Sequence, residues 1–279
     1  MSSLRCLLLI VFAATLPAQP ATGAANELPP AQAQALVDRA LANELGAAQD
    51  ASHPMRYQLR KTSPRLSATK EICETRDGDV ARLVAINGQP LSPAGELQEQ
   101  ARLDALLADP GKQRHRKQSE DADAARALKV LRALPSAFVY QYAGSGEGPA
   151  GKIERYTFQP NPNFSPPDLE TQVLTAMTGE IWIDPARQRV ARLEGHLQRD
   201  VDFGWGILGR LNKGGWIAID QAAVAGGQWR IVRFQMAMSG RVVWKTRVFD
   251  TTEEQTNFAP VPTSLDYKKA IALLREEPK

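Results

Sequence analysis

An α+β fold, built on one curved antiparallel sheet with helices against its concave face, is predicted by three features of this 279-residue sequence. Apolar and polar residues alternate in long runs from Gly179 to Asp250, which is the period of strands with one buried face. Taken as a single strand, Arg189–Phe203 would exceed ~40 Å, a length that suits a curved sheet or a barrel wall. The helical segments are separated from these strands along the chain, as in α+β proteins.

The first 25 residues have the organisation of a secretion signal. Arg5 supplies a positive charge, Leu7–Ala14 an apolar core, and Ala21–Ala24 a run of small residues suited to cleavage. The apolar core is too short to cross a bilayer as a helix. We therefore expect cleavage near Ala24 or Ala25 and a soluble exported product, with a retained N-terminal anchor as the alternative.

Residues 26–279 are expected to form a single β domain with a helical insertion at about 96–134. The one candidate linker, around Leu91–Gly95, is too short to separate two domains. Lys and Arg total 34 and Asp and Glu 31, spread along the chain, so no nucleic-acid surface is indicated. After cleavage Cys73 is the remaining cysteine, which excludes an internal disulfide and favours an ordinary strand thiol over a catalytic one.

A helix and a hairpin are the first elements expected after the signal. Ala31–Leu45 places its apolar residues on one face and follows two prolines, as at a helix start. Ala68–Glu74 and Asp79–Ile86 both alternate, and Asp77-Gly78 between them is a strong hairpin signal. Asn87-Gly88 is expected to end the second strand.

The stretch Glu96–Leu134 has helical periodicity on both sides of a break at Pro110-Gly111, which predicts two helices. It contains a basic run, Lys112–Lys117, that has two interpretations. The run could touch anionic lipid headgroups. Its lack of aromatic or apolar neighbours favours a solvated helix end or hinge instead.

Strands return after this helical pair, and a helix closes the chain. The prolines of Pro160–Pro167 require an extended loop. Asp168–Met177 fits either a strand or a short helix. The other expected elements are strands at Phe138–Tyr142 and Lys152–Pro160, turns at Asp184-Pro185 and Gly226-Gly227, and a terminal helix from Asp266 capped by Ser264.

The sequence shows no catalytic machinery. Gly146–Lys152 is close to a phosphate loop, but Ile153 stands where magnesium coordination needs a hydroxyl, and a strand pattern follows. The three histidines are far apart, and none has a partner at metal-ligand spacing. Glu194, Asp200 and Asp202 could pair as acid and base, but their alternation with basic residues is more typical of a solvated sheet face.

Apolar residues on the inward faces of the long strands are the candidate ligand-binding residues: Leu193, Leu197, Phe203, Val232, Phe234, Met236, Met238 and Trp244. Trp244 is expected with Val242, Thr246 and Val248 on the strand that neighbours the two methionines. Methionine deforms to accept flexible chains. This face is either a close-packed core beneath helices or a partly filled cavity that accepts acyl chains. Arg199 interrupts it, as a possible headgroup contact or as a paired arginine at a strand end.

These features resemble the LolA-like superfamily, which comprises periplasmic lipoprotein carriers, their outer-membrane acceptors and RseB-type sensor domains. The resemblance rests on the export signal, the N-terminal helix, the strands around Asp77-Gly78, and the hairpin formed by Gly179–Asp184 and Arg189–Gly195. It implies an unclosed antiparallel barrel with helices as a lid, an apolar cavity for acyl chains, a periplasmic location, and neither enzyme activity nor a cofactor. This chain is longer than the carriers and carries the helical stretch Glu96–Leu134 in addition.

The leading hypothesis is a monomeric periplasmic carrier of lipid or lipoprotein, with acyl chains as ligand and a membrane-bound protein as possible partner. The alternative is an exported interaction or sensor module of the same fold that binds protein or peptide without lipid transport. An exported hydrolase that uses Glu194, Asp200 or Asp202 is the third and weakest hypothesis.

Overall fold

The computed structural model describes residues 30–148, 151–204, 209–242 and 245–276. The predicted secretion signal, residues 1–25, lies outside the described residues. Within those ranges, no helix is both long and apolar enough to cross a membrane.

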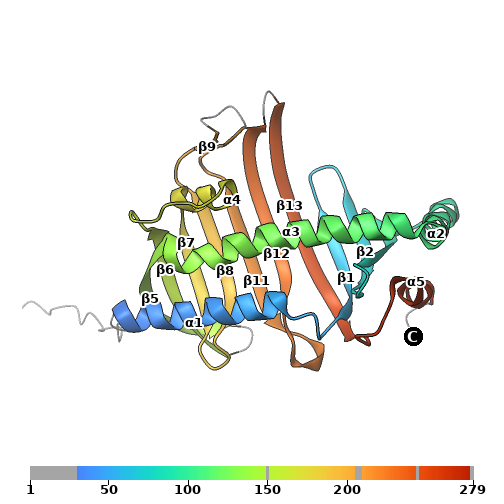
Figure 1. The fold of residues 1–279 in the computed structure, drawn as a ribbon, viewed down its shortest axis with the longest axis horizontal. Helices are drawn as coiled ribbons and strands as arrows, with labels where there is room; N and C mark the ends of the chain where they lie inside the picture. Colours follow the sequence, from blue (N-terminus) through green and yellow to red (C-terminus); the bar gives the residue numbers. More distant parts are fainter. Residues whose placement is uncertain (1–29, 149–150, 205–208, 243–244, 277–279) are drawn as a thin grey trace, which may run out of the picture.

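One 13-stranded antiparallel sheet forms the body of the molecule (Figure 1). No pairing joins its two edge strands within the described ranges, so the sheet is open. From edge to edge the order is β4 (Gln89–Pro90), β3 (Val80–Ile86), β2 (Ser67–Cys73), β1 (Met55–Thr62), β13 (Lys245–Pro260), β12 (Trp229–Val242), β11 (Trp216–Ala223), β8 (Arg189–Leu197), β7 (Met177–Asp184), β6 (Gly151–Pro160) and β5 (Phe138–Gly148). A short pair, β9 (Val201–Phe203) and β10 (Gly209–Leu211), continues from the end of β12.

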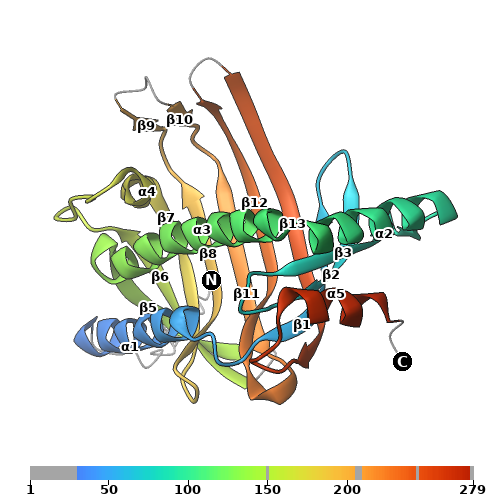
Figure 2. The same cartoon turned by 45° about the vertical axis from the view of Figure 1, so that its right-hand side comes forward.

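Helices cover one face of this sheet. Figures 1 and 2 show α1 and α3 running across the concave face, with α2 and α5 at the β1–β3 end. The predicted α+β class, with a curved, unclosed antiparallel sheet and helices over its concave face, is therefore confirmed. The helices are α1 (Pro30–Gln49), α2 (Pro93–Ala108), α3 (Pro110–Ala137), α4 (Leu169–Gln172) and α5 (Tyr267–Arg275), with short 3-10 turns η1 (Val173–Ala176) and η2 (Ala225–Gly227).

Two separate hydrophobic clusters hold the helices to the sheet. The first joins α1 and the end of α3 to β5–β8, and its fully buried members include Val37, Tyr156 and Ile181. The second joins α2 and α5 to β2 and β3, through residues such as Leu103 and Ile271. Among the described residues, the strands between these clusters, β11, β12, β13 and β1, contribute no buried residue to either one.

Local chemistry fixes where the helices begin. Ser92 accepts a hydrogen bond from Gly95 N at the start of α2, and Asp109 accepts one from Gly111 N at the start of α3, which places the predicted break at Pro110. The predicted cap of the last helix is wrong. Asp266, not Ser264, caps α5, because its carboxylate accepts from Lys269 N at 2.9 Å.

The single long strand predicted at Arg189–Phe203 is also wrong. β8 ends at Leu197, and the chain bends before β9, which pairs only with β10 in the described part of the sheet. The bend is fixed by distant backbone: Leu197 N donates to Gly215 O at 2.8 Å, and Gln198 N donates to Ala176 O at 2.9 Å. The ambiguous stretch Asp168–Met177 is helical, as α4 and η1.

The grouping of Trp244 with Val242, Thr246 and Val248 as one inward-facing row needs correction. Val242 belongs to β12, and Trp244 lies outside the described residues. Pairing across this hairpin joins Met238 to Phe249 and Ser239 to Val248, so even-numbered residues of β12 face odd-numbered residues of β13. Val248 therefore points away from the Met238 side, and it is 72% exposed.

Candidate functional site

A cross-strand row of apolar side chains runs along the helix-covered face from β7 to β12. Ile181 pairs with Leu193, Leu193 with Ile219, and Ile219 with Phe234. Directly paired residues share a face. Burial decreases along the row: Ile181 is fully buried, Leu193 is packed partly against the first cluster, and Ile219 and Phe234 are half-buried and belong to neither cluster.

At the β7–β8 end this face is close-packed. A side chain at Gly179 would place its Cβ 1.9 Å from Glu194 O, and one at Gly195 would place it 2.6 Å from Met177 Sδ. Leu197 is 1% exposed and lies in the first cluster. For this part of the face, the close-packed interpretation is the one that the structure supports.

The predicted ligand residues thus fall into three groups. Leu197 is core, while Leu193, Phe203 and Met238 pack partly against the first cluster. Trp244 lies outside the described residues. The third group, Val232, Phe234 and Met236, is half-buried and belongs to neither cluster. Val232 lies at a register shift between β11 and β12, whereas Phe234 and Met236 pair with Ile219 and Ile217 on the helix-covered face. We call Ile219, Phe234 and Met236 the apolar strip.

Charged groups border the apolar strip. Glu253 of β13 pairs directly with Phe234, and its carboxylate accepts a hydrogen bond from Lys61 Nζ at 2.7 Å. Near the start of β12, Arg230 contacts Glu74 at 3.4 Å. An apolar surface with charged borders matches the chemistry of an amphiphile, whose chain needs burial and whose head needs a polar partner.

Arg199, the predicted headgroup contact, is exposed in the bend after β8. Its guanidinium donates to the backbone oxygen and to the hydroxyl of Thr175, both at 3.0 Å. Its hydrogen-bond partners therefore lie in η1 and not on the apolar strip.

The carboxylates considered as an acid–base pair are held in ion pairs. Glu194 is bonded to Arg192 and His196, and the hydrogen bond from Arg192 is the largest cause that holds the pKa of Glu194 below its ordinary value. Asp202 is bonded to Arg210 at 2.6 Å. A carboxyl group with a lowered pKa is a poor proton donor near neutral pH.

Other reactive groups are equally constrained. Burial raises the pKa of the Cys73 thiol to about 11, so the thiol stays protonated at neutral pH. Within the described ranges, no group of three or more His, Cys, Asp or Glu side chains is arranged to hold a metal ion.

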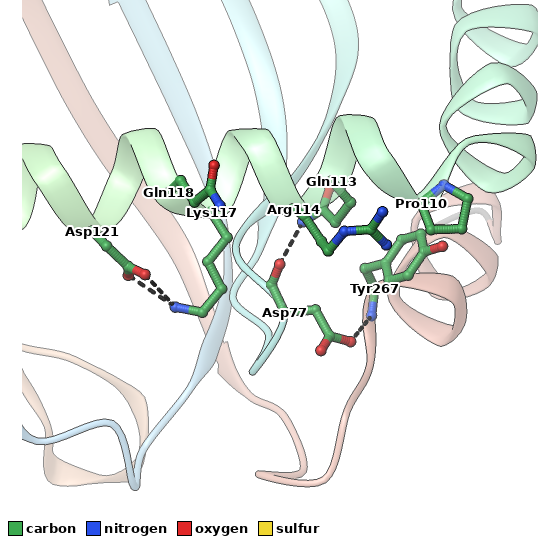
Figure 3. Close-up of a pocket in the computed structure, with 8 residues that line it drawn as sticks. All are labelled: Asp77, Pro110, Gln113, Arg114, Lys117, Gln118, Asp121 and Tyr267. Atoms are coloured by element: carbon green, nitrogen blue, oxygen red, sulfur yellow. Dashed lines mark hydrogen bonds and ion pairs between the residues drawn. The ribbon is translucent and has the colours of Figure 1, made fainter.

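A separate pocket of about 460 Å³ lies where the start of α3 meets α5 and the β2–β3 turn (Figure 3). Gln113 donates to Asp77 O at 3.0 Å, and Asp77 accepts from Tyr267 N at 3.3 Å, which joins the three elements. None of the predicted ligand residues lines it. Its lining is polar and of mixed charge: Asp77, Pro110, Gln113, Arg114, Lys117, Gln118, Asp121 and Tyr267.

The basic run Lys112–Lys117 lies within α3 and borders this pocket. Arg116 pairs with Glu120 at 2.9 Å, and Lys117 with Asp121 at 2.8 Å, each one turn along the helix. Such pairs are typical of a solvated helix face. Sequence reasoning missed the pocket, because Gln113 and Tyr267 are more than a hundred residues apart and carry no motif.

No protein-family model matches the sequence, and no curated protein does. One solved structure that matches is a domain from Vibrio parahaemolyticus described as outer membrane lipoprotein-sorting, with 10% identity over 88% of this chain and 100% of that one, and a TM-score of 0.32. Another is a DUF1329 family protein from Desulfovibrio piger, with 10% identity over 82% and 92% of the two chains and a TM-score of 0.29. The description of the Vibrio structure names the same class of protein that the sequence resembles. The fold assignment rests on the strand order and the helix positions of this chain, and not on these two matches.

Proposed function

We propose that this protein is a non-enzymatic periplasmic carrier of lipid or of lipid-modified protein, and that the acyl chain lies on the apolar strip. The proposal is carried by one observation. Ile219 of β11 and Phe234 and Met236 of β12 lie on the helix-covered face, remain half-buried, and belong to neither packed cluster. Apolar side chains on a covered face are ordinarily packed, so a ligand that completes their burial is the natural occupant.

The energetics suit an acyl chain. Each methylene that is fully removed from water contributes about 0.8 kcal/mol, so a few methylenes against the strip outweigh the loss of chain freedom. Met236 has the flexible side chain that accommodates a mobile ligand. The Lys61–Glu253 ion pair at the border offers a polar environment for the ligand head.

Two parts of the proposal concern chain organisation. Residues 1–25 would direct export and be removed, and residues 26–279 would act as one domain, with the helical stretch at about 96–134 inserted into it. The helices α2 and α3 together run from Pro93 to Ala137 and so include that stretch, and α3 runs over the central strands in Figure 1.

A matched pair of variants on one strand tests the site. Phe234→Asp places a charge on the apolar strip, whereas Gln235→Asp places it on the opposite face of the same strand. We expect Phe234→Asp to weaken binding of a fluorescent long-chain fatty acid by about tenfold or more, and Gln235→Asp by less than about twofold. Melting temperatures of both variants separate loss of the site from loss of the fold.

Two results would contradict the proposal. One is a wild-type protein that binds no fatty acid, and the other is an equal effect of both variants. If the wild-type protein instead retains a defined peptide or protein that lipid does not displace, the interaction-module alternative takes its place.

A further inference from the structure

The β12–β13 hairpin extends beyond the rest of the sheet. The pairing of β1 with β13 stops at Thr62 and Thr252, so the described strand pairings leave residues 245–250 of β13 paired on the β12 side only. All residues from Lys245 to Asp250 are exposed. Figures 1 and 2 show this end of the hairpin rising above α3, beside β9 and β10.

Apolar side chains are exposed on both faces of this extension. Val248 is 72% exposed and Phe249 is 43% exposed, and as neighbours in a strand they point to opposite sides. The other large apolar side chains that are exposed in the described ranges occur singly along the sequence. An adjacent pair on a projecting strand is a surface that favours an apolar environment.

Basic residues accompany this pair. From Arg241 to Phe249 the sequence contains Arg241, Lys245 and Arg247 and no acidic residue. Asp250 follows at the end of the exposed run, so residues 241–250 carry a formal charge of +2. Lysine on a strand edge can serve merely to prevent pairing with another chain, but Val248 and Phe249 would oppose that purpose.

We propose that this end of the hairpin docks onto the anionic surface of a lipid bilayer. The docking surface, which we call the hairpin tip, comprises Arg241, Lys245, Arg247, Val248 and Phe249. The cations would lie at the headgroup level, and the valine and phenylalanine would enter the boundary with the acyl chains. Docking goes beyond the proposed acyl binding, because it uses a different surface and would bring the carrier to the membrane from which it loads or into which it unloads.

Vesicle co-sedimentation tests the docking. We expect the wild-type protein to bind vesicles of phosphatidylcholine mixed with phosphatidylglycerol, to release them at high salt, and to bind pure phosphatidylcholine weakly. Lys245→Gln and Arg247→Gln should each lower the partition coefficient about fivefold. Val248→Asp should lower it further, while Leu97→Asp, a change on α2 at a side chain that is also 72% exposed, should leave it unchanged.

Three outcomes would overturn the docking proposal. The first is a wild-type protein that does not bind anionic vesicles. The second is an equal loss of vesicle binding in Val248→Asp and Leu97→Asp. The third is a wild-type protein that forms a dimer, with Val248→Asp abolishing the dimer and not vesicle binding. The last would make a second copy of the chain the occupant of the hairpin tip. Fatty-acid binding measured on the same variants should be unchanged, so failure of docking is distinguishable from failure of the acyl site.

Discussion

Asp79 is a half-buried carboxyl group at the junction of the β2–β3 turn, α3 and β12. Its backbone N donates to Glu120 Oε2 at 2.9 Å. Burial, followed by the charges of Glu120 and Glu74, raises the pKa of Asp79 from 3.8 to about 7, against the opposing effects of Arg116 and Arg230. The group is therefore close to half-protonated at neutral pH.

This pKa makes stability depend on pH. Between about pH 4 and pH 7 the folded protein holds a proton on Asp79 that the unfolded chain has released, so this group's contribution to stability falls as the pH rises through that window. Asp79→Asn should remove that dependence and raise the free energy of unfolding at pH 8 by about 1–2 kcal/mol, a figure reduced for partial exposure. Urea unfolding at pH 5 and pH 8 measures it, and a variant as pH-sensitive as the wild type would contradict the assignment.

At single residues, the sequence predicts which apolar side chains face inward but not how deeply each one is buried. Alternation placed Leu197, Val232, Phe234 and Met236 on inward faces. Leu197 lies in the first cluster, Phe234 and Met236 pair with residues of the helix-covered face, and Val232 lies at a register shift that periodicity could not reveal. Alternation could not show that Leu197 is sealed in the first cluster while the β12 residues stay half-buried. That difference depends on which strands the helices contact, and helix placement is not encoded in strand periodicity.

Among the elements, α1 is attached to the sheet by a buried charge. Glu44 is 8% exposed and accepts hydrogen bonds from Arg189 Nε at 2.8 Å, Arg189 Nη2 at 2.9 Å and Val190 N at 2.9 Å. Gln221 also donates to it, at 3.2 Å. The Glu44 carboxylate therefore joins α1 to β8 and to β11, and these hydrogen bonds hold α1 over β8.

Removing this carboxylate should loosen the helix. Glu44→Ala leaves Arg189 without its partner and should lower the free energy of unfolding by about 3 kcal/mol. Asp38→Ala, on the exposed face of the same helix, should change it by less than about 0.5 kcal/mol. Denaturant titration compares the two, and hydrogen exchange should show the α1 amides losing protection only in the first. Equal effects would mean that apolar packing alone holds the helix.

Local turn chemistry explains which elements were predictable. Asn87 and Gly88 have φ of 51° and 77°, and Gly226 and Gly227 have φ of 71° and 72°, the left-handed backbone that these residue types favour. The break inside Arg189–Phe203 was not predictable, because it depends on hydrogen bonds to Ala176 and Gly215, which are distant in sequence.

At the scale of the whole molecule, an open curved sheet is packed with helices at both ends and less tightly across its middle. Separation of helices from strands predicted the α+β class and the covered concave face, because both follow from the order of periodic segments. Whether the interior is filled or hollow was left open by the sequence. The two clusters are close-packed, and the apolar strip is the part of the covered face that we propose for ligand binding.

The affinity of the wild-type protein for a homologous series of saturated fatty acids tests the central claim most directly. If acyl chains are buried on the apolar strip, the dissociation constant should fall by up to about fourfold for each added methylene, until the strip is filled. Isothermal titration calorimetry across the series measures this dependence. A dissociation constant that does not change with chain length would contradict acyl binding, and with it the proposed carrier function.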